Sequence, residues 1–302
     1  MNNISKLGLG IIAFEGLEHI KNITYELRNL CDIIIICLQK YSYHGIEISQ
    51  DDIDEAYLLK EFGYVDDVIW FEPHDKHAND DEKIVPRLIE TDKRNFILDY
   101  LETNGCSHSI IIDSDEYYDH CDFKNAIELV DKENYKITYC QYLNYYRDYR
   151  HLLIWPFLCY VPFVASSKYR FNFKSSSFNK PSDPTRRYEI PLEDNTEFKI
   201  LDFNVIKMHH LSWIRKDITK KIDNWSAKKY FKNYNNLCKN ILDRYYNYKD
   251  GQNAIIMFNV PYNNVAVDVL DKQYIHPKFI LNESIKQLDY NESSSIDNVS
   301  QC

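Results

Sequence analysis

Long hydrophobic runs, blocks of basic residues and closely spaced cysteines are what this 302-residue sequence lacks. No run of eighteen apolar residues occurs, so we expect no transmembrane segment, and the N-terminus shows no signal-peptide cleavage pattern. No run of Lys and Arg exceeds three residues and the formal net charge is −10, which argues against nucleic acid as a partner. The eight cysteines include no CxxC pair, which argues against a zinc site or a disulfide framework and for reduced core cysteines. We therefore expect a cytoplasmic protein.

The N-terminal part of the chain alternates buried strands with amphipathic helices. Residues 7–14 and 32–38 have the apolar character of strands, and residues 16–30 between them carry apolar side chains at helical spacing. A strand, helix, strand unit of this length implies a parallel sheet. Gly8 and Gly10 fall inside the first strand and not in the turn after it, so they do not form a dinucleotide fingerprint. The alternation continues with a helix at 51–62, a strand at 67–71, a helix at 84–104 and a strand from 109.

The C-terminal part of the chain is rich in tyrosine. Residues 135–149 and 151–166 read as strands whose tyrosines offer flat faces for sugar rings, although packing of β-rich sequence also explains them. The apolar run 152–164 is too short to span a bilayer and leaves a peripheral membrane contact open. Residues 172–197 form a long polar loop, which in a compact domain indicates a functional lid. The other expected elements are a helix at 123–134, a strand at 199–208, a helix at 218–248 and a strand at 265–270.

An apolar run that ends in acids organises the sequence. Three consecutive isoleucines, 110–112, are typical of a strand buried on both faces, and Asp113 and Asp115 follow at its carboxyl end. Side chains two residues apart in an extended segment point the same way, so the two carboxylates can converge on one cation. Such a pair suits Mg²⁺ or Mn²⁺ carrying phosphates, while a strand followed by a solvated acidic turn is the alternative. An EF-hand is excluded because Tyr118 and Lys124 stand where glycine and glutamate are needed.

Two further chemistries use an Asp-x-Asp after a buried strand. A phosphatase of the haloacid-dehalogenase type normally has Thr or Val two residues on, where this chain has Tyr117. In a nucleotide-sugar site, a divalent ion between the acids and two phosphate oxygens stabilises the departing nucleoside diphosphate. The second chemistry uses every feature placed so far, and it requires a third ligand from elsewhere in the sheet and basic residues near the phosphates.

The stretch 93–116 consists of a helix with a basic start, a glycine and a buried strand that leads to Asp113-Ser-Asp115-Glu116. It resembles the DxD region of GT-A glycosyltransferases. The segment 209–216, His-His-Leu-Ser-Trp-Ile-Arg-Lys, is similar to the His-x-Ser-aromatic segment near the end of family 2-like and family 17-like members. With the N-terminal strand, helix, strand unit, the likeness covers most of residues 7–225.

The resemblance implies a role for each matching position. Asp113, Asp115 and His210 would bind the metal, Mn²⁺ in preference to Mg²⁺ because of the imidazole, with His209 as the alternate ligand. An inverting member takes its catalytic base from a Glu-Asp pair, for which Glu193 and Asp194 are the candidates. The residues expected around the nucleotide-sugar are Ala13, Phe14, Gln39, Lys93, Arg94, Asp113, Ser114, Arg215 and Lys221.

The expected fold is therefore α/β: a GT-A, Rossmann-like mixed sheet, mainly parallel and flanked by helices, with a C-terminal helical extension. One domain would span 1–290, with a nucleotide-binding half at 7–120, an acceptor half at 121–290 and a disordered tail at 291–302. The expected activity is metal-dependent transfer of sugar from a nucleotide-diphospho-sugar, a UDP-sugar, to a hydroxyl of a glycan, lipid or protein. A nucleotidyltransferase of similar fold and a non-catalytic carbohydrate-binding module are the alternatives, although a nucleotidyltransferase needs a glycine-rich loop where this chain has only Glu15-Gly16.

Overall fold

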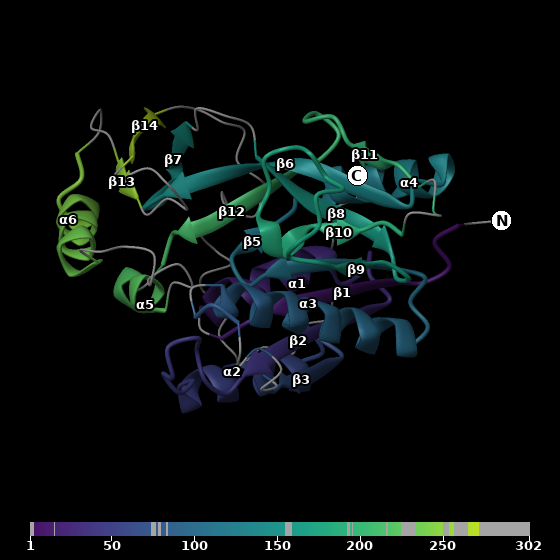
Figure 1. The fold of residues 1–302 in the computed structure, drawn as a ribbon, viewed down its shortest axis with the longest axis horizontal. Coiled ribbons are helices and arrows are strands. Elements are labelled where there is room, and N and C mark those ends of the chain that lie inside the picture. The colour runs from purple at the N-terminus through teal and green to yellow at the C-terminus, as the bar shows by residue number, and fades with distance from the viewer. Residues whose placement is uncertain are drawn as a thin grey trace.

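One mixed sheet of twelve strands runs through the part of the chain that the computed structural model describes (Figure 1). Its main order is β13-β14-β7-β6-β8-β4-β1-β2-β3, while β11 and β12 pair with β6 and β5 pairs with β12. The α/β class and the mixed sheet flanked by helices are therefore confirmed. The described residues are 3–14, 16–73, 77, 80–82, 84–154, 159–191, 194, 196–215, 217–224, 234–249, 254–256 and 265–271.

The first four strands are parallel and follow the order β3-β2-β1-β4. Because β2 lies on one side of β1 and β4 on the other, the carboxyl ends of β1 and β4 meet at a topological switch point, where ligands of open α/β sheets bind. The register places Ile12 of β1 opposite Asp113 of β4. The elements of this part are β1 Leu7–Ile12, α1 Ile20–Leu27, β2 Ile33–Gln39, α2 Gln50–Glu61, β3 Asp67–Phe71, α3 Val85–Thr103 and β4 His108–Asp113.

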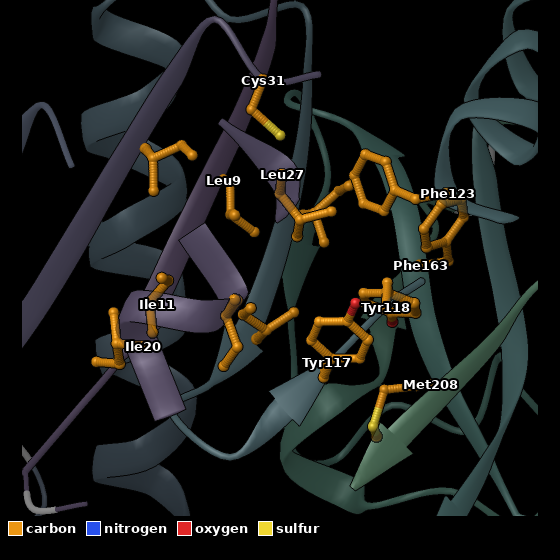
Figure 2. Packing of buried hydrophobic residues seen from close by; sticks show 14 of the residues in the cluster. Leu9, Ile11, Ile20, Leu27, Cys31, Tyr117, Tyr118, Phe123, Phe163 and Met208 are labelled. Atoms are coloured by element: carbon orange, nitrogen blue, oxygen red, sulfur yellow. The ribbon is translucent and has the colours of Figure 1, made fainter. Parts of the chain in front are cut away.

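Separate hydrophobic cores cover the two faces of this sheet. On one face, Leu9 and Ile11 of β1 pack with Ile20 and Leu27 of α1, and Figure 2 shows this cluster continuing toward Phe123 of α4. The other core joins α3 to the opposite side chains of β2 and β4 and to the β9-β10 hairpin. Burial on both faces explains why these strands read as continuous apolar runs.

The second half of the chain extends the same sheet. β8 runs antiparallel to both β4 and β6, whereas β12 lies parallel to β6 and antiparallel to β5. A third, smaller core holds α5 and α6 against Tyr146 and Trp213. The elements are β5 Glu116–Tyr117, α4 His120–Glu133, β6 Ile137–Tyr146, β7 Asp148–Ile154, β8 Tyr160–Ser166, β9 Arg170–Phe171, β10 Tyr188–Glu189, β11 Phe198–Ile200, β12 Lys207–Trp213, α5 Ile218–Asp223, α6 Tyr234–Tyr246, β13 Ala254–Ile256 and β14 Val265–Asp271.

Several expected boundaries differ from the structure. The strand expected at 199–208 is two strands, β11 and β12, and the histidine pair lies inside β12 because that strand continues to pair with β6. The segment 218–248 contains two helices, α5 and α6. The segment 151–166 likewise contains two strands, β7 and β8. The tail expected at 291–302 lies outside the described residues.

The cysteines and helices test two further expectations. Cys31, Cys37, Cys106 and Cys140 are free and buried, as expected of core thiols, but Cys121 is disulfide-bonded, so the expectation of reduced cysteines is wrong there. No helix among the described residues combines the length and the apolar character that crossing a membrane requires.

The two glycines of β1 allow α3 to pack close to the sheet. A Cβ atom at Gly10 would lie 2.1 Å from Cγ2 of Ile97, and one at Gly8 would lie 2.9 Å from Cδ2 of Leu101. The approach to Gly10 is the closer of the two and involves Cγ2 and Cβ of Ile97, whereas the atoms near Gly8 are the far ends of the Leu101 and Cys106 side chains. These glycines therefore serve helix packing.

Gly10→Ala should destabilise the protein by about 1–3 kcal/mol, because the added methyl group overpacks Ile97. Gly8→Ala, the matched control on the same face, should cost less. The free energy of unfolding from urea titrations checks this. In the double variant with Ile97→Ala the loss should be smaller than the sum of the single losses, and strictly additive losses would contradict the proposed contact.

Candidate functional site

The acidic turn after β4 is fixed by backbone hydrogen bonds from two directions. The N–H of Ser114 donates to the carbonyl of Ile12 at 3.0 Å, and the N–H of Leu211 donates to the carbonyl of Asp115 at 2.7 Å. The turn then enters β5, in which Glu116 lies opposite His210 of β12. The strand pairing therefore brings a histidine from about ninety-five residues later in the sequence to the DxD turn.

The two oxygens of Asp115 face different partners. Oδ1 lies 3.5 Å from Nε2 of His210, whereas Oδ2 lies 2.6 Å from Nη2 of Arg215 and 3.5 Å from Nζ of Lys221. Burial raises the pKa of the Asp115 carboxyl, but Lys221, Arg215 and His210 outweigh burial and hold the pKa well below its ordinary value. Asp115 is therefore ionised. Burial also lowers the pKa of the Lys221 ammonium, against the opposing effect of Asp115.

The two histidines of β12 point to opposite faces of the strand, as neighbours on a strand must. His210 faces Asp115, and its Nδ1 lies 2.6 Å from Oδ1 of Asn144. His209 is buried on the other face, where its Nδ1 lies 2.7 Å from the hydroxyl of Tyr145 and its ring stacks on the tyrosine ring. Of the two histidines, His210 is thus the one that the structure brings to the acids.

Asp113 is held by two arginines. Nη2 of Arg94 lies 3.1 Å from Oδ1, and the guanidinium of Arg186 donates to Oδ2. Arg186 also binds Glu116 with both of its terminal nitrogens, at 2.9 and 2.7 Å. Burial raises the pKa of Asp113, but Arg186 and Arg94 outweigh it and keep the pKa below its ordinary value. Burial raises the pKa of Glu116 despite Arg186.

Arg94 donates from the same Nη2 to Glu90, 2.7 Å away, which completes a network of Glu90, Arg94, Asp113, Arg186 and Glu116. Asp115 forms a second group with Arg215 and Lys221. Together the two groups hold four carboxylates and four cations, which we call the charge cluster. Its members are Glu90, Asp113, Asp115, Glu116, Arg94, Arg186, Arg215 and Lys221.

Sequence reasoning missed the contribution of Arg186 and of Gly16. Arg186 lies in the polar loop, seventy residues from Glu116, and no local pattern signals that contact. Gly16 has a φ of 76°, and a Cβ atom there would lie 1.4 Å from Nη1 of Arg215, so the arginine passes directly over the glycine. Its positive φ and that approach both require glycine. In the sequence, the Glu15-Gly16 pair after β1 was the feature that could have indicated the role of Gly16.

The remaining residues expected near the donor lie close to the ends of β1 and β2. Nζ of the buried Lys93 donates to the carbonyl of Ala13 at 2.9 Å, so this lysine holds the end of β1. Burial lowers the pKa of Lys93. Gln39 donates to the carbonyl of Tyr41 at 2.7 Å, and Phe14 packs partly buried against the core. Ala13 and Gln39 therefore lie at the sheet edge where the sequence placed them.

The structure does not bring Asp194 to the charge cluster. Its carboxylate accepts from Lys168 at 3.1 Å and from Tyr169 at 2.9 Å, and these residues follow β8 beyond the amino end of β4, where Ser166 pairs with His108. The strand from there to Asp113 is about 17 Å long. Hydrogen bonds from Thr196, Lys168 and Tyr169 hold the pKa of Asp194 far below its ordinary value, which makes a weak base. Glu193 lies outside the described residues.

The donor atoms near Asp115 fit a divalent ion in part. Oδ1 of Asp115 and Nε2 of His210 face each other, whereas Asp113 is already neutralised by its arginines. Among the residues described, no group of three or more His, Cys, Asp or Glu side chains is arranged to hold a metal. Nε and Nη1 of Arg94 and Nε of Arg215 are buried N–H groups without a hydrogen-bond partner in the described structure. Two ligands and several spare donors are therefore present.

No family model and no curated protein matches this chain. Among solved structures, TarS of S. aureus in residues 1–349 has 11% sequence identity over 72% of this chain, with a TM-score of 0.40. The complex of the same protein with UDP-GlcNAc has 13% identity over 46% of this chain, with a TM-score of 0.30. The chain spans 63% and 35% of the lengths of these two TarS chains.

The inositol-1-phosphate CTP transferase of T. maritima is a further similar structure. It has 9% identity over 74% of this chain and 97% of its own, with a TM-score of 0.38. Likenesses at these TM-scores carry no conclusion about the activity of this chain.

Arg186→Met should lower the free energy of unfolding by about 3–5 kcal/mol, because it leaves the buried carboxylate of Glu116 and the partly buried carboxylate of Asp113 without their shared cation. Arg187→Met is the matched control, since its guanidinium reaches only Ser182 among the hydrogen bonds of the described residues. It should cost less than about 1 kcal/mol. Urea unfolding of both variants checks the difference, and equal losses would contradict the role given to Arg186.

Proposed function

We propose that this protein is a metal-dependent glycosyltransferase of the GT-A type that transfers a sugar from a nucleotide-diphospho-sugar to a hydroxyl acceptor. A UDP-sugar is the expected donor, and a glycan, lipid or protein the expected acceptor. The proposal treats 7–120 as the nucleotide-binding half and 121–290 as the acceptor half of one domain. It rests on the charge cluster at the carboxyl ends of β1 and β4.

The observation that supports the proposal most strongly is that the two carboxylate oxygens of Asp115 contact different groups. One carboxylate oxygen faces the His210 imidazole and the other faces Arg215 and Lys221. A carboxylate and an imidazole at a switch point form a site for a divalent ion, and adjacent cations suit the phosphates that such an ion carries.

Charge balance supports the same conclusion. The four carboxylates of the charge cluster are matched by its four cations. A diphosphate that enters a balanced site adds negative charge in a region of low dielectric, which costs free energy unless a cation enters with it. We therefore expect the nucleotide and the divalent ion to bind together more tightly than either binds alone.

Asp115 and His210 would hold the ion, and an imidazole ligand favours Mn²⁺ over Mg²⁺. When bound, the ion neutralises charge that develops on the departing nucleoside diphosphate. Arg215 and Lys221 donate toward the same phosphates, and the unpartnered Nε of Arg215 is available for this. Asp113 positions Arg94 and Arg186. The catalytic base is not assigned to Asp194, because the structure places that carboxylate at the far end of β4.

Release of UDP, GDP or CMP from a panel of UDP-, GDP- and CMP-sugars with Mn²⁺ tests the proposal. UDP-GlcNAc belongs in the panel because a TarS structure holds it. One donor should be hydrolysed slowly by the native protein, and Asp115→Asn should reduce the rate at least about 100-fold, since it removes a ligand charge. Asp122→Asn is the matched control, because Asp122 pairs with Lys207 outside the charge cluster, and it should leave the rate unchanged.

The same assay separates the alternatives. Release of pyrophosphate from a nucleoside triphosphate and a sugar phosphate would establish a nucleotidyltransferase instead. Binding of glycans without nucleotide or metal, combined with no effect of any donor on thermal stability, would establish a carbohydrate-binding module. Either result would overturn the proposed transferase.

A further inference from the structure

His19 is a buried histidine that joins the turn after β1 to the segment after β12. It ends the one-turn helix Leu17–His19, and its Nε2 lies 2.7 Å from the carbonyl oxygen of Ile214. Leu17 and Ile20, on either side of it in the sequence, are buried in the core that covers this face of the sheet. His19 therefore projects from an element that is fixed by packing.

The hydrogen bond between His19 and Ile214 has a defined direction. A carbonyl oxygen only accepts hydrogen bonds, so Nε2 of His19 carries the hydrogen and donates it. Burial first, and then the neighbouring Arg215, lowers the pKa of His19, so the ring is neutral at neutral pH. His19 thus satisfies the carbonyl without adding a positive charge beside the guanidinium of Arg215, as a lysine would.

Two further groups hold the backbone of the same segment. The carbonyl of Trp213 accepts from the N–H of Arg147 at 3.1 Å and from the hydroxyl of Tyr245 at 2.8 Å. The carbonyls of residues 213 and 214 are thus both fixed, by groups from the turn between β6 and β7, from α6 and from the turn after β1. The backbone from which the Arg215 side chain starts is therefore anchored by three other parts of the chain.

The side chain that this anchored backbone carries lies in the candidate donor site. The guanidinium of Arg215 passes directly over Gly16, three residues before His19, and its Nη2 lies 2.6 Å from Oδ2 of Asp115. Its Nε is buried and has no hydrogen-bond partner in the described structure, so that N–H is available for a phosphate oxygen. A long side chain loses rotamer entropy when it binds a ligand, and ordering it beforehand reduces this cost.

We propose that His19 is a positioning residue, whose hydrogen bond to the Ile214 carbonyl holds Arg215 over Gly16 in the orientation that receives a diphosphate. The effect on nucleotide binding rests on the proposed function, whereas the placement of Arg215 is a property of the chain itself. The turn after β1 and the segment after β12 then act as one unit, although His19 and Ile214 are 195 residues apart.

Two substitutions of His19 test this role. His19→Gln keeps a neutral side chain that can donate to the carbonyl of Ile214, whereas His19→Met has a similar length and cannot donate. His120→Met is the matched control, because Nδ1 of His120 lies 2.6 Å from the carbonyl of Glu26, outside the charge cluster. Thermal unfolding checks that each variant is folded.

The first measurement needs no ligand. The Nε–H of Arg215 is assigned in nitrogen-15 spectra by its absence from Arg215→Gln, and its exchange with solvent is then followed. Because this N–H is buried, it should exchange slowly in the native protein, in His19→Gln and in His120→Met, and at least about 10-fold faster in His19→Met. Fast exchange in the native protein, or unchanged exchange in a folded His19→Met, would overturn the positioning role.

The second measurement is the affinity for UDP with Mn²⁺, from isothermal titration calorimetry. His19→Met should weaken binding about 5- to 10-fold, which corresponds to the net contribution of one hydrogen bond, whereas His19→Gln and His120→Met should bind as the native protein does. In the Arg215→Gln background, His19→Met should change the affinity less than about 2-fold, because its effect passes through that arginine.

Two outcomes of the affinity measurement separate the two proposals. Equal weakening by His19→Met in both backgrounds would show that His19 acts independently of Arg215, and it would overturn the positioning role. If the native protein binds no UDP while the exchange of the Arg215 Nε–H responds as expected, the positioning role stands and the proposed function fails.

Discussion

Three carboxylates within four residues, buried at Asp115 and Glu116 and partly buried at Asp113, are the constraint on which the rest of the structure depends. Each buried charge must be paired, because an unpaired carboxylate in this environment is far more costly than a paired one. The cations come from three separate segments: Arg94 from α3, Arg186 from the loop before β10, and Arg215 with Lys221 from the region after β12. The acidic turn therefore holds together segments that are distant from one another in the sequence.

The same turn joins the two halves of the sheet. β4 belongs to the parallel N-terminal strands, and β5, which follows the acids, pairs with β12 of the second half. A residue of β12 can therefore approach the carboxyl end of β4 although the two strands are not neighbours. Because the pairing is fixed by backbone hydrogen bonds and by cores on both faces, His210 and Asp115 are held in place before any ligand binds.

Local patterns were sufficient to predict the elements of the N-terminal half and the acidic turn, whereas three expected elements of the second half are each two in the structure. Burial along the whole length of a segment leaves a periodic apolar pattern in the sequence. Such patterns identified β1, β2 and β4 as apolar runs and α3 by its helical spacing. The pairs that define the site are not local: Arg186 meets Glu116 across seventy residues, and Asp194 is adjacent in sequence to loop residues but lies at the opposite end of β4. The sequence of a polar loop does not show which carboxylate each of its basic residues will contact. Asp194 therefore matched a motif in the sequence but lies too far from the charge cluster to serve it as a base.

The central claim is that Asp115 and His210 share a divalent ion that arrives with a nucleotide. Anomalous diffraction at the manganese absorption edge, from crystals grown with Mn²⁺ and UDP, tests it most directly. The account requires an anomalous peak within bonding distance of Oδ1 of Asp115 and Nε2 of His210, with the diphosphate on the side of Arg215 and Lys221. Nucleotide bound at the sheet edge without such a peak, while Arg215 still occupies Asp115, would contradict the account.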